Sequence, residues 1–221
     1  MPPGRRSRRD SDPGTHPRAR LVEQLRRSGI TDADVLRAIA ETPRELFVPE
    51  QQQRHAYEDR ALPIGEGQTI SQPLVVAMMT QAARVGPHDR VLEIGTGSGY
   101  GAAVVARLAA HVTTVERLPD LATAARDRLD ALGLDNVEVH VADGTLGWED
   151  DAPWDAIIVT AAAPELPEPL LTQLAEGGRL VAPVGGRGSQ RLLRAVRTAT
   201  GTTHEDLGGV AFVPLIGEQG W

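Results

Sequence analysis

The sequence predicts an α/β fold: a doubly wound, mostly parallel seven-stranded sheet, with a helical cap before it and antiparallel strands at its C-terminal edge. From Arg90 onward, short apolar runs alternate with helical patterns, which is typical of strands joined by right-handed crossovers. A glycine-rich turn, GTGSGYG, follows the first apolar run, as in sheets that bind a nucleotide at their strand ends. With 221 residues, 41% of them apolar, the chain is long enough to bury one complete core.

Two segments precede the sheet. Residues 1–20 contain six Arg and two Asp and almost nothing apolar, so we expect a disordered Arg-rich tail. Residues 21–85 are expected to form a helical cap and a polar loop, because their helical patterns are short and interrupted by Gly and Pro. That loop, GEGQTISQP at residues 65–73, carries more hydroxyl and amide groups than a connector needs, and it leads into a buried helix.

Residues 86–185 are expected to form the core of the sheet. The predicted strands are RVLEI (90–94), HVTTVE (111–116), VEVHVAD (137–143), WDAIIVTAAA (154–163) and RLVAPVG (179–185). Between them, residues 95–110 are predicted to form a glycine turn that leads into a helix, and further helices are predicted over 118–133 and 167–178. Residues 186–221 are expected to add two antiparallel edge strands, the second running into FVPLI, so that 21–221 form a single domain.

Composition excludes several kinds of chemistry. The chain has no Cys, and all 23 of its basic residues are Arg, so disulfides, thiolate nucleophiles, Schiff bases and a phosphate-loop Lys are excluded. The six His lack metal-ligand spacing, and we expect no metal. No apolar run is long enough to span a membrane and no secretory signal is visible, so a cytoplasmic protein is expected. Residues 21–221 carry 17 Arg and 28 acidic residues, which argues against nucleic-acid binding by this body.

Three successive predicted strand ends offer groups to one adenosine-like ligand. The first is the glycine turn from Gly95, which lets a ligand approach the backbone closely. The second is Glu116, 21 positions further on, where an acid accepts hydrogen bonds from ribose hydroxyls. The third is Asp143-Gly144, suited to the edge of an adenine. Taken singly, Glu116 could instead be a solvated strand end, and Asp143-Gly144 an ordinary turn.

Glu93 separates two classes of enzyme that use such a sheet. The dinucleotide fingerprint of dehydrogenases fails, because its third glycine would be Tyr100. A carboxylate two residues before the turn suits a ligand with a positive end, such as S-adenosylmethionine, better than a pyrophosphate. The pattern E-x-G-x-G-x-G is the methyltransferase form of this turn. The alternatives are an NAD-dependent dehydrogenase, and a Glu93 that is merely paired with an Arg.

The segments GEGQTISQP, VLEIGTGSGYG, VEVHVADGTLGW, WDAIIVTAAAPE and FVPLIGEQGW resemble the protein-L-isoaspartate O-methyltransferase family over roughly residues 21–221. The resemblance implies a Rossmann-like class I methyltransferase fold, with S-adenosyl-L-methionine as cofactor and S-adenosyl-L-homocysteine as product. It also implies repair: methylation of the α-carboxyl of L-isoaspartyl residues in damaged proteins and peptides, leading through a succinimide to Asp. A monomer that acts on such chains, with no membrane partner, is expected.

The resemblance assigns site residues by position. The implied cofactor contacts are Gln68, Thr69, Ile70, Ser71, Glu93, Gly95, Gly97, Ser98, Glu116, Asp143 and Gly144. Ser71 is the implied catalytic residue, and the implied substrate contacts are Ser71, Phe212, Val213 and Leu215. Val76 and Ile216 depart from the pattern, because some members have His and Thr there.

A carboxylate nucleophile is already ionised at neutral pH, since its pKa is about 4, and it needs no general base. We therefore expect Ser71 to orient the attacking carboxylate rather than to react covalently. A second interpretation, compatible with the first, makes Ser71 the N-cap of the following helix. Two other functions stay open: methylation of an Asp side chain in a dedicated peptide, and binding of S-adenosylmethionine without turnover.

Overall fold

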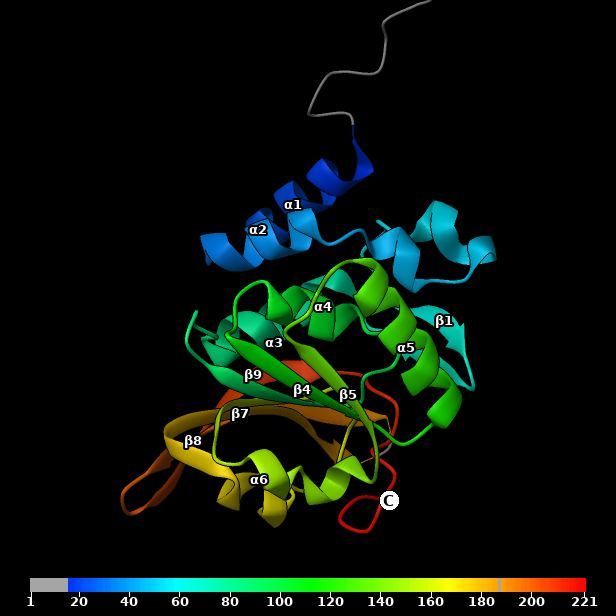
Figure 1. The fold of residues 1–221 in the computed structure, drawn as a ribbon. Coiled ribbons are helices and arrows are strands. Elements are labelled where there is room, and N and C mark those ends of the chain that lie inside the picture. Colours follow the sequence, from blue (N-terminus) through cyan, green and yellow to red (C-terminus); the bar gives the residue numbers. More distant parts are fainter. Residues whose placement is uncertain (1–15, 187) are drawn as a thin grey trace, which may run out of the picture.

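A seven-stranded sheet runs through the middle of the protein, with helices on both faces (Figure 1). The computed structural model describes residues 16–186 and 188–221. The strands of the sheet are β3 Arg90–Ile94, β4 His111–Glu116, β5 Val137–Val141, β6 Trp154–Val159, β7 Leu174–Gly186, β8 Ser189–Thr198 and β9 Gly201–Val210. Their order is β5-β4-β3-β6-β7-β8-β9; neighbours from β5 to β7 are parallel, and β8 and β9 are antiparallel. The predicted fold class is confirmed.

Helices cover the two faces of the sheet unequally. The helices are α1 Pro17–Arg27, α2 Ala33–Glu41, α3 Pro73–Ala83, α4 Tyr100–Ala106, α5 Pro119–Ala131 and α6 Glu168–Thr172. Val91 of β3 packs into the core formed with α1 to α5, whereas its neighbour Leu92 packs into a second core with Leu170 of α6. Alternation along the strand therefore feeds two cores, so apolar side chains of β3 are buried on both faces of the sheet.

The cap consists of α1, α2 and two 3₁₀ segments, η2 Arg44–Phe47 and η3 Glu50–His55, above the α3–α5 face (Figure 1). Helix α1 begins at Pro17, inside the expected tail of residues 1–20, because Leu21 and Leu25 are buried in the core beneath it. Residues 1–15 of that tail lie outside the described part. Across the described residues, no helix has the length and apolarity that a membrane crossing requires.

The prediction of a polar loop over residues 65–73, before α3, is partly wrong, because this segment contains a strand. Residues Leu62–Gly65 (β1) and Gln68–Ile70 (β2) form an antiparallel hairpin. Its turn has positive φ at Glu66 (51°) and Gly67 (69°), the two central positions that a type I′ turn requires. The hairpin holds residues 68–70 in an extended conformation just before Ser71.

The prediction of a helix over residues 167–178 is also wrong in its second half, which is a strand. Helix α6 ends at Thr172, and β7 begins at Leu174, which pairs with Trp154 of β6. Both side chains are fully buried, so tertiary packing overrides the helical pattern of this segment. The register then shifts before Arg179 pairs with Ala156, and Gly177, at φ 76°, lies in the irregular stretch.

The C-terminal segment does not extend the edge strand as expected. Strand β9 ends at Val210, and the chain then crosses back over the sheet to pair with the loop after β6. Ala162 N–H donates to the carbonyl of Val213 at 2.8 Å, and Leu215 N–H donates to the carbonyl of Ala162 at 2.8 Å. The motif FVPLI therefore lies against the carboxyl ends of the parallel strands rather than in the antiparallel edge.

Candidate functional site

A cavity opens at the carboxyl ends of β3, β4 and β6, the edge at which the sequence predicted a ligand. It encloses about 1070 Å³ of empty space, its open mouth included. The β2 strand and Ser71 line one side of it, and residues 213–216 line another. Segments from before and after the parallel core are thus brought to one site.

The glycine turn forms the floor of the cavity. Gly95, Gly97 and Gly99 have φ values of 95°, 54° and 91°, in the left-handed region that favours glycine. A Cβ at Gly95 would overlap the hydroxyl of Thr160, which donates to the Ile94 carbonyl at 3.0 Å and also to the Gly95 carbonyl. The predicted contacts Gly95, Gly97 and Ser98 all line the cavity.

Glu93 lies on the cavity wall and is 1% exposed. Thr114 donates a hydrogen bond of 2.6 Å to its Oε2, and a Cβ added at Gly101 would overlap its Oε1. Burial raises the pKa of Glu93 to about 8. The negative charge of Glu116 also raises it, whereas the hydrogen bond from Thr114 lowers it. No Arg of the described chain contacts it, so the expected alternative of an Arg pair is not seen. A buried carboxyl without a cation suits a positively charged ligand group.

Glu116 ends β4 with its carboxylate held by backbone donors. Gly97 N–H donates to Oε2 at 2.8 Å, and Leu118 N–H donates to Oε1 at 3.1 Å. The side chain is 6% exposed and lines the cavity. Each carboxylate oxygen accepts more than one hydrogen bond, so both can still accept from a diol in the cavity.

Asp143 and Gly144 take different places after β5. Gly144 lines the cavity, and a Cβ there would lie 2.6 Å from Ile94 Cγ2, so glycine is required for this packing. Asp143 is not among the lining residues, and its oxygens accept from Thr145 N–H (2.9 Å) and hydroxyl (2.7 Å) and from Glu218 N–H (2.8 Å). Burial alone would raise the pKa of Asp143, but these hydrogen bonds hold it below its ordinary value.

Ser71 is half-buried on the cavity wall with Gln68, Thr69 and Ile70. Its hydroxyl makes no hydrogen bond within the described chain. The N-cap of α3 is Gln72 rather than Ser71, and Leu74 N–H donates to Asp59 Oδ1 at 2.8 Å instead. The interpretation of Ser71 as a helix cap is therefore wrong, and its hydroxyl is available to a ligand.

The predicted substrate contacts are only partly brought together. Val213 and Leu215 line the cavity, whereas Phe212 packs against the core and its N–H donates to Gln190 Oε1 at 2.8 Å. Val76 and Ile216, the two departures, also line the cavity. Sequence reasoning missed further lining residues, notably Met79, Thr80, Thr96, Tyr100 and Thr160. A hydroxyl within or at the end of an apolar run was the available signal for Thr80 and Thr160, and a place within the glycine turn was the signal for Thr96.

Comparisons with known proteins agree with this geometry. The family model of protein-L-isoaspartate(D-aspartate) O-methyltransferase matches residues 16–220. Proteins named protein-L-isoaspartate O-methyltransferase from Methanoculleus marisnigri and Roseiflexus castenholzii are each 56% identical, over 96% and 94% of this chain and 97% and 95% of their own. Among solved structures, one titled protein-L-isoaspartate O-methyltransferase has a TM-score of 0.85 at 30% identity, covering 92% of this chain and 67% of its own. A Plasmodium falciparum structure titled beta-aspartate methyltransferase, in complex with S-adenosyl-L-homocysteine, has a TM-score of 0.78 at 29% identity, covering 89% and 97%.

Proposed function

The chain belongs to the protein-L-isoaspartate(D-aspartate) O-methyltransferase family, and on this premise we propose that it methylates the α-carboxyl of L-isoaspartyl residues in damaged proteins and peptides, with Ser71 orienting that carboxylate. The methyl ester then closes to a succinimide, which hydrolyses back to Asp. The single observation that carries the role of Ser71 is its unpartnered hydroxyl on the wall of the cavity.

The residues of the cavity fit S-adenosyl-L-methionine. Glu93 offers a buried carboxyl without a cation, suited to the positively charged end of this molecule. Glu116 has acceptor capacity for ribose hydroxyls, and Gly144 leaves space that a Cβ would fill. When bound, S-adenosyl-L-methionine supplies a methyl group on a positively charged sulfur.

The protein's own task is to bind, to orient and to exclude water. The substrate carboxylate is ionised at neutral pH, so no residue has to remove a proton from it. Aligning two bound reactants contributes roughly 7–11 kcal/mol, and removal of water strengthens the attraction between opposite charges. The Ser71 hydroxyl donates to one carboxylate oxygen and leaves the other free to attack. Val213 and Leu215 provide the opposite wall, against which a peptide lies.

Ser71→Ala tests this role. A hydrogen bond to a charged group contributes about 1.5–3 kcal/mol, so turnover with an isoaspartyl peptide should fall roughly 10- to 100-fold. The affinity for S-adenosylmethionine, measured by calorimetry, should stay within about twofold, because Glu93 and Glu116 are unchanged. Ser189→Ala, an exposed serine on β8, is the matched control.

Wild-type turnover in the Ser71→Ala variant would refute the orienting role. The same radiolabelled methyl-transfer assay should compare isoaspartyl and aspartyl versions of one peptide. Methylation of the isoaspartyl version alone is expected for repair. Equal methylation of the aspartyl version would contradict it and indicate a substrate with an Asp side chain.

A further inference from the structure

Arg44 of η2 is fully buried, although it belongs to the cap and not to the cavity. Its guanidinium donates to three backbone carbonyls: Nε to Ala56 at 2.8 Å, Nη2 to Arg60 at 3.4 Å and Nη2 to Ser71 at 2.9 Å. No carboxylate of the described chain forms an ion pair with it. A buried charge is costly, so its retention beside Ser71 calls for a reason.

The guanidinium also contacts the cavity wall. Its carbon lies 4.8 Å from the centroid of the Tyr100 ring, and Tyr100 lines the cavity at the start of α4. The ring of Phe47 packs edge-on against the ring of Tyr100, with the two ring centroids 5.5 Å apart. Arg44 therefore joins the cap, the Ser71 segment and the first helix of the nucleotide turn. Only a planar fork with several donors reaches these partners together.

Asp59, in the loop between η3 and β1, holds the same segment from its other end. Asp59 accepts a hydrogen bond from Leu74 N–H at 2.8 Å and from the Gln72 side chain at 3.1 Å. Ser71 lies between strand β2 and helix α3 and belongs to neither. Its carbonyl accepts from Arg44, and Asp59 holds Gln72 and Leu74, which follow it in the chain. The side chains of Arg44 and Asp59 therefore fix the position of Ser71.

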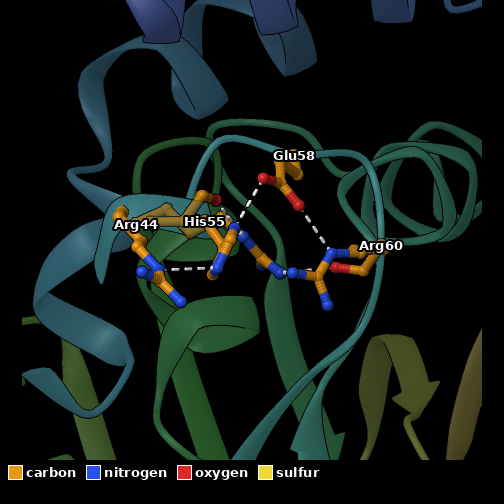
Figure 2. A network of polar contacts seen from close by, with 6 residues as sticks. Arg44, His55, Glu58 and Arg60 are labelled. Atoms are coloured by element: carbon orange, nitrogen blue, oxygen red, sulfur yellow. Dashed lines mark hydrogen bonds and ion pairs between the residues drawn. The ribbon is translucent and has the colours of Figure 1, made fainter. Parts of the chain in front are cut away.

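Figure 2 shows polar contacts in the segment of residues 55–60, which carries two of the carbonyls to which Arg44 donates. Glu58 bridges His55, at 2.6 Å from Nδ1 to Oε1, and Arg60, at 2.6 Å from Nε to Oε2. These contacts link His55 to Arg60 through Glu58, and the same segment carries the carbonyls of Ala56 and Arg60, to which Arg44 donates. Two of the three carbonyls to which Arg44 donates therefore lie in a segment with side-chain contacts of its own.

We propose that Arg44 is a positioning residue for methyl transfer, which sets the place of the Ser71 hydroxyl through the hydrogen bond to the Ser71 carbonyl. The inference rests on the proposed role of Ser71. A purely structural role of Arg44 predicts a different result, because loss of stability does not depend on which side chain residue 71 carries.

A double-mutant cycle separates the two roles. Arg44→Lys keeps the charge but loses the fork, and we expect turnover with an isoaspartyl peptide to fall about tenfold or more. The dissociation constant for S-adenosylmethionine should stay within about threefold. In the Ser71→Ala background the same substitution should lower turnover by less than about twofold, because its target is already gone.

Arg179→Lys is the matched control. Arg179 also donates to two backbone carbonyls, those of Ala83 and Arg84, at 2.8 Å each, and it pairs with Asp89 away from the cavity. We expect this variant to lower the midpoint of thermal unfolding while turnover stays within about twofold in both backgrounds.

An equal loss from Arg44→Lys in both backgrounds would overturn the inference. If Arg44→Lys does not fold, Asp59→Ala takes its place, because it removes the hydrogen bonds to Gln72 and Leu74. Its effect on turnover should also be non-additive with that of Ser71→Ala. Additive effects of these two substitutions would equally overturn the inference. Wild-type turnover of Ser71→Ala beside a slow Arg44→Lys would overturn both the role of Ser71 and the coupling. A slow Ser71→Ala with an additive cycle would overturn the coupling alone.

Discussion

Replacement of Glu93 by Gln should stabilise the ligand-free protein at high pH while weakening its cofactor site. Glu93 is buried, and its pKa in the folded protein is about 8, against an ordinary value of 4.5. Between these values the folded chain keeps a proton that the unfolded chain has lost. The contribution of Glu93 to the stability of the folded protein is therefore fully present below pH 4.5, and it is lost as the pH rises to about 8.

The size of the effect follows from the shift. A difference of one in pKa corresponds to about 1.4 kcal/mol. Ionisation of Glu93 should therefore lower the unfolding free energy of the wild-type protein by roughly 5 kcal/mol between pH 4.5 and pH 8. Gln resembles the protonated acid and does not titrate. The two proteins should be about equally stable near pH 4.5, and Glu93→Gln should be more stable by roughly 3 kcal/mol at pH 7.

Urea unfolding of both proteins at pH 5, 6, 7 and 8 measures this difference. Titrating groups that do not interact with Glu93 contribute equally to both proteins and cancel, and the exposed Glu165→Gln serves as the control variant. Calorimetry at pH 8 should show weaker binding of S-adenosylmethionine by Glu93→Gln, because the negative charge is absent. A stability difference that stays constant across this pH range would refute the reasoning.

Two further predictions concern the neighbours of the cavity. Thr114→Val removes the hydrogen bond that lowers the pKa of Glu93 in the folded protein, so the upper end of the pH window should move to higher pH, and cofactor affinity at pH 7 should fall about tenfold. An upper end that stays in place in urea unfolding would contradict this. Asp143→Ala removes the acceptor of Glu218 N–H, so hydrogen exchange of residues 217–221 should accelerate and cofactor affinity should fall as Gly144 shifts. Unchanged exchange would contradict the anchoring role, and unchanged calorimetric affinity would contradict the cofactor role.

The core strands and the site at their ends could be predicted because local and tertiary signals agree there. The expected bounds of β3 and β4 match the structure, since each apolar run is buried on both faces and ends at a Gly or an acid. Parallel strands bring successive carboxyl ends to one edge, so Glu93, Gly97, Glu116 and Gly144 meet in one cavity.

The remaining differences arise where partners far apart in sequence decide the structure. Leu174 becomes a strand residue because it pairs with the buried Trp154, which its own helical pattern does not reveal. Phe212 lies next to lining residues, yet its side chain packs into the core. The role of Asp59 at the start of α3 depends on a contact across 15 positions, so sequence reasoning assigned the cap to Ser71 instead.

The hydrogen bonds around Asp143 also have a consequence for the chemical ageing of this chain. Asp143-Gly144 is its single Asp-Gly pair, and the sequence has no Asn-Gly pair. In such pairs the amide nitrogen of the unhindered Gly attacks the side-chain carboxyl and begins the rearrangement to isoaspartate. Thr145 and Glu218 hold this carboxyl ionised and immobile, which makes it a poor electrophile. The bonds that anchor residues 217–221 therefore also protect this enzyme from becoming a target of its own repair.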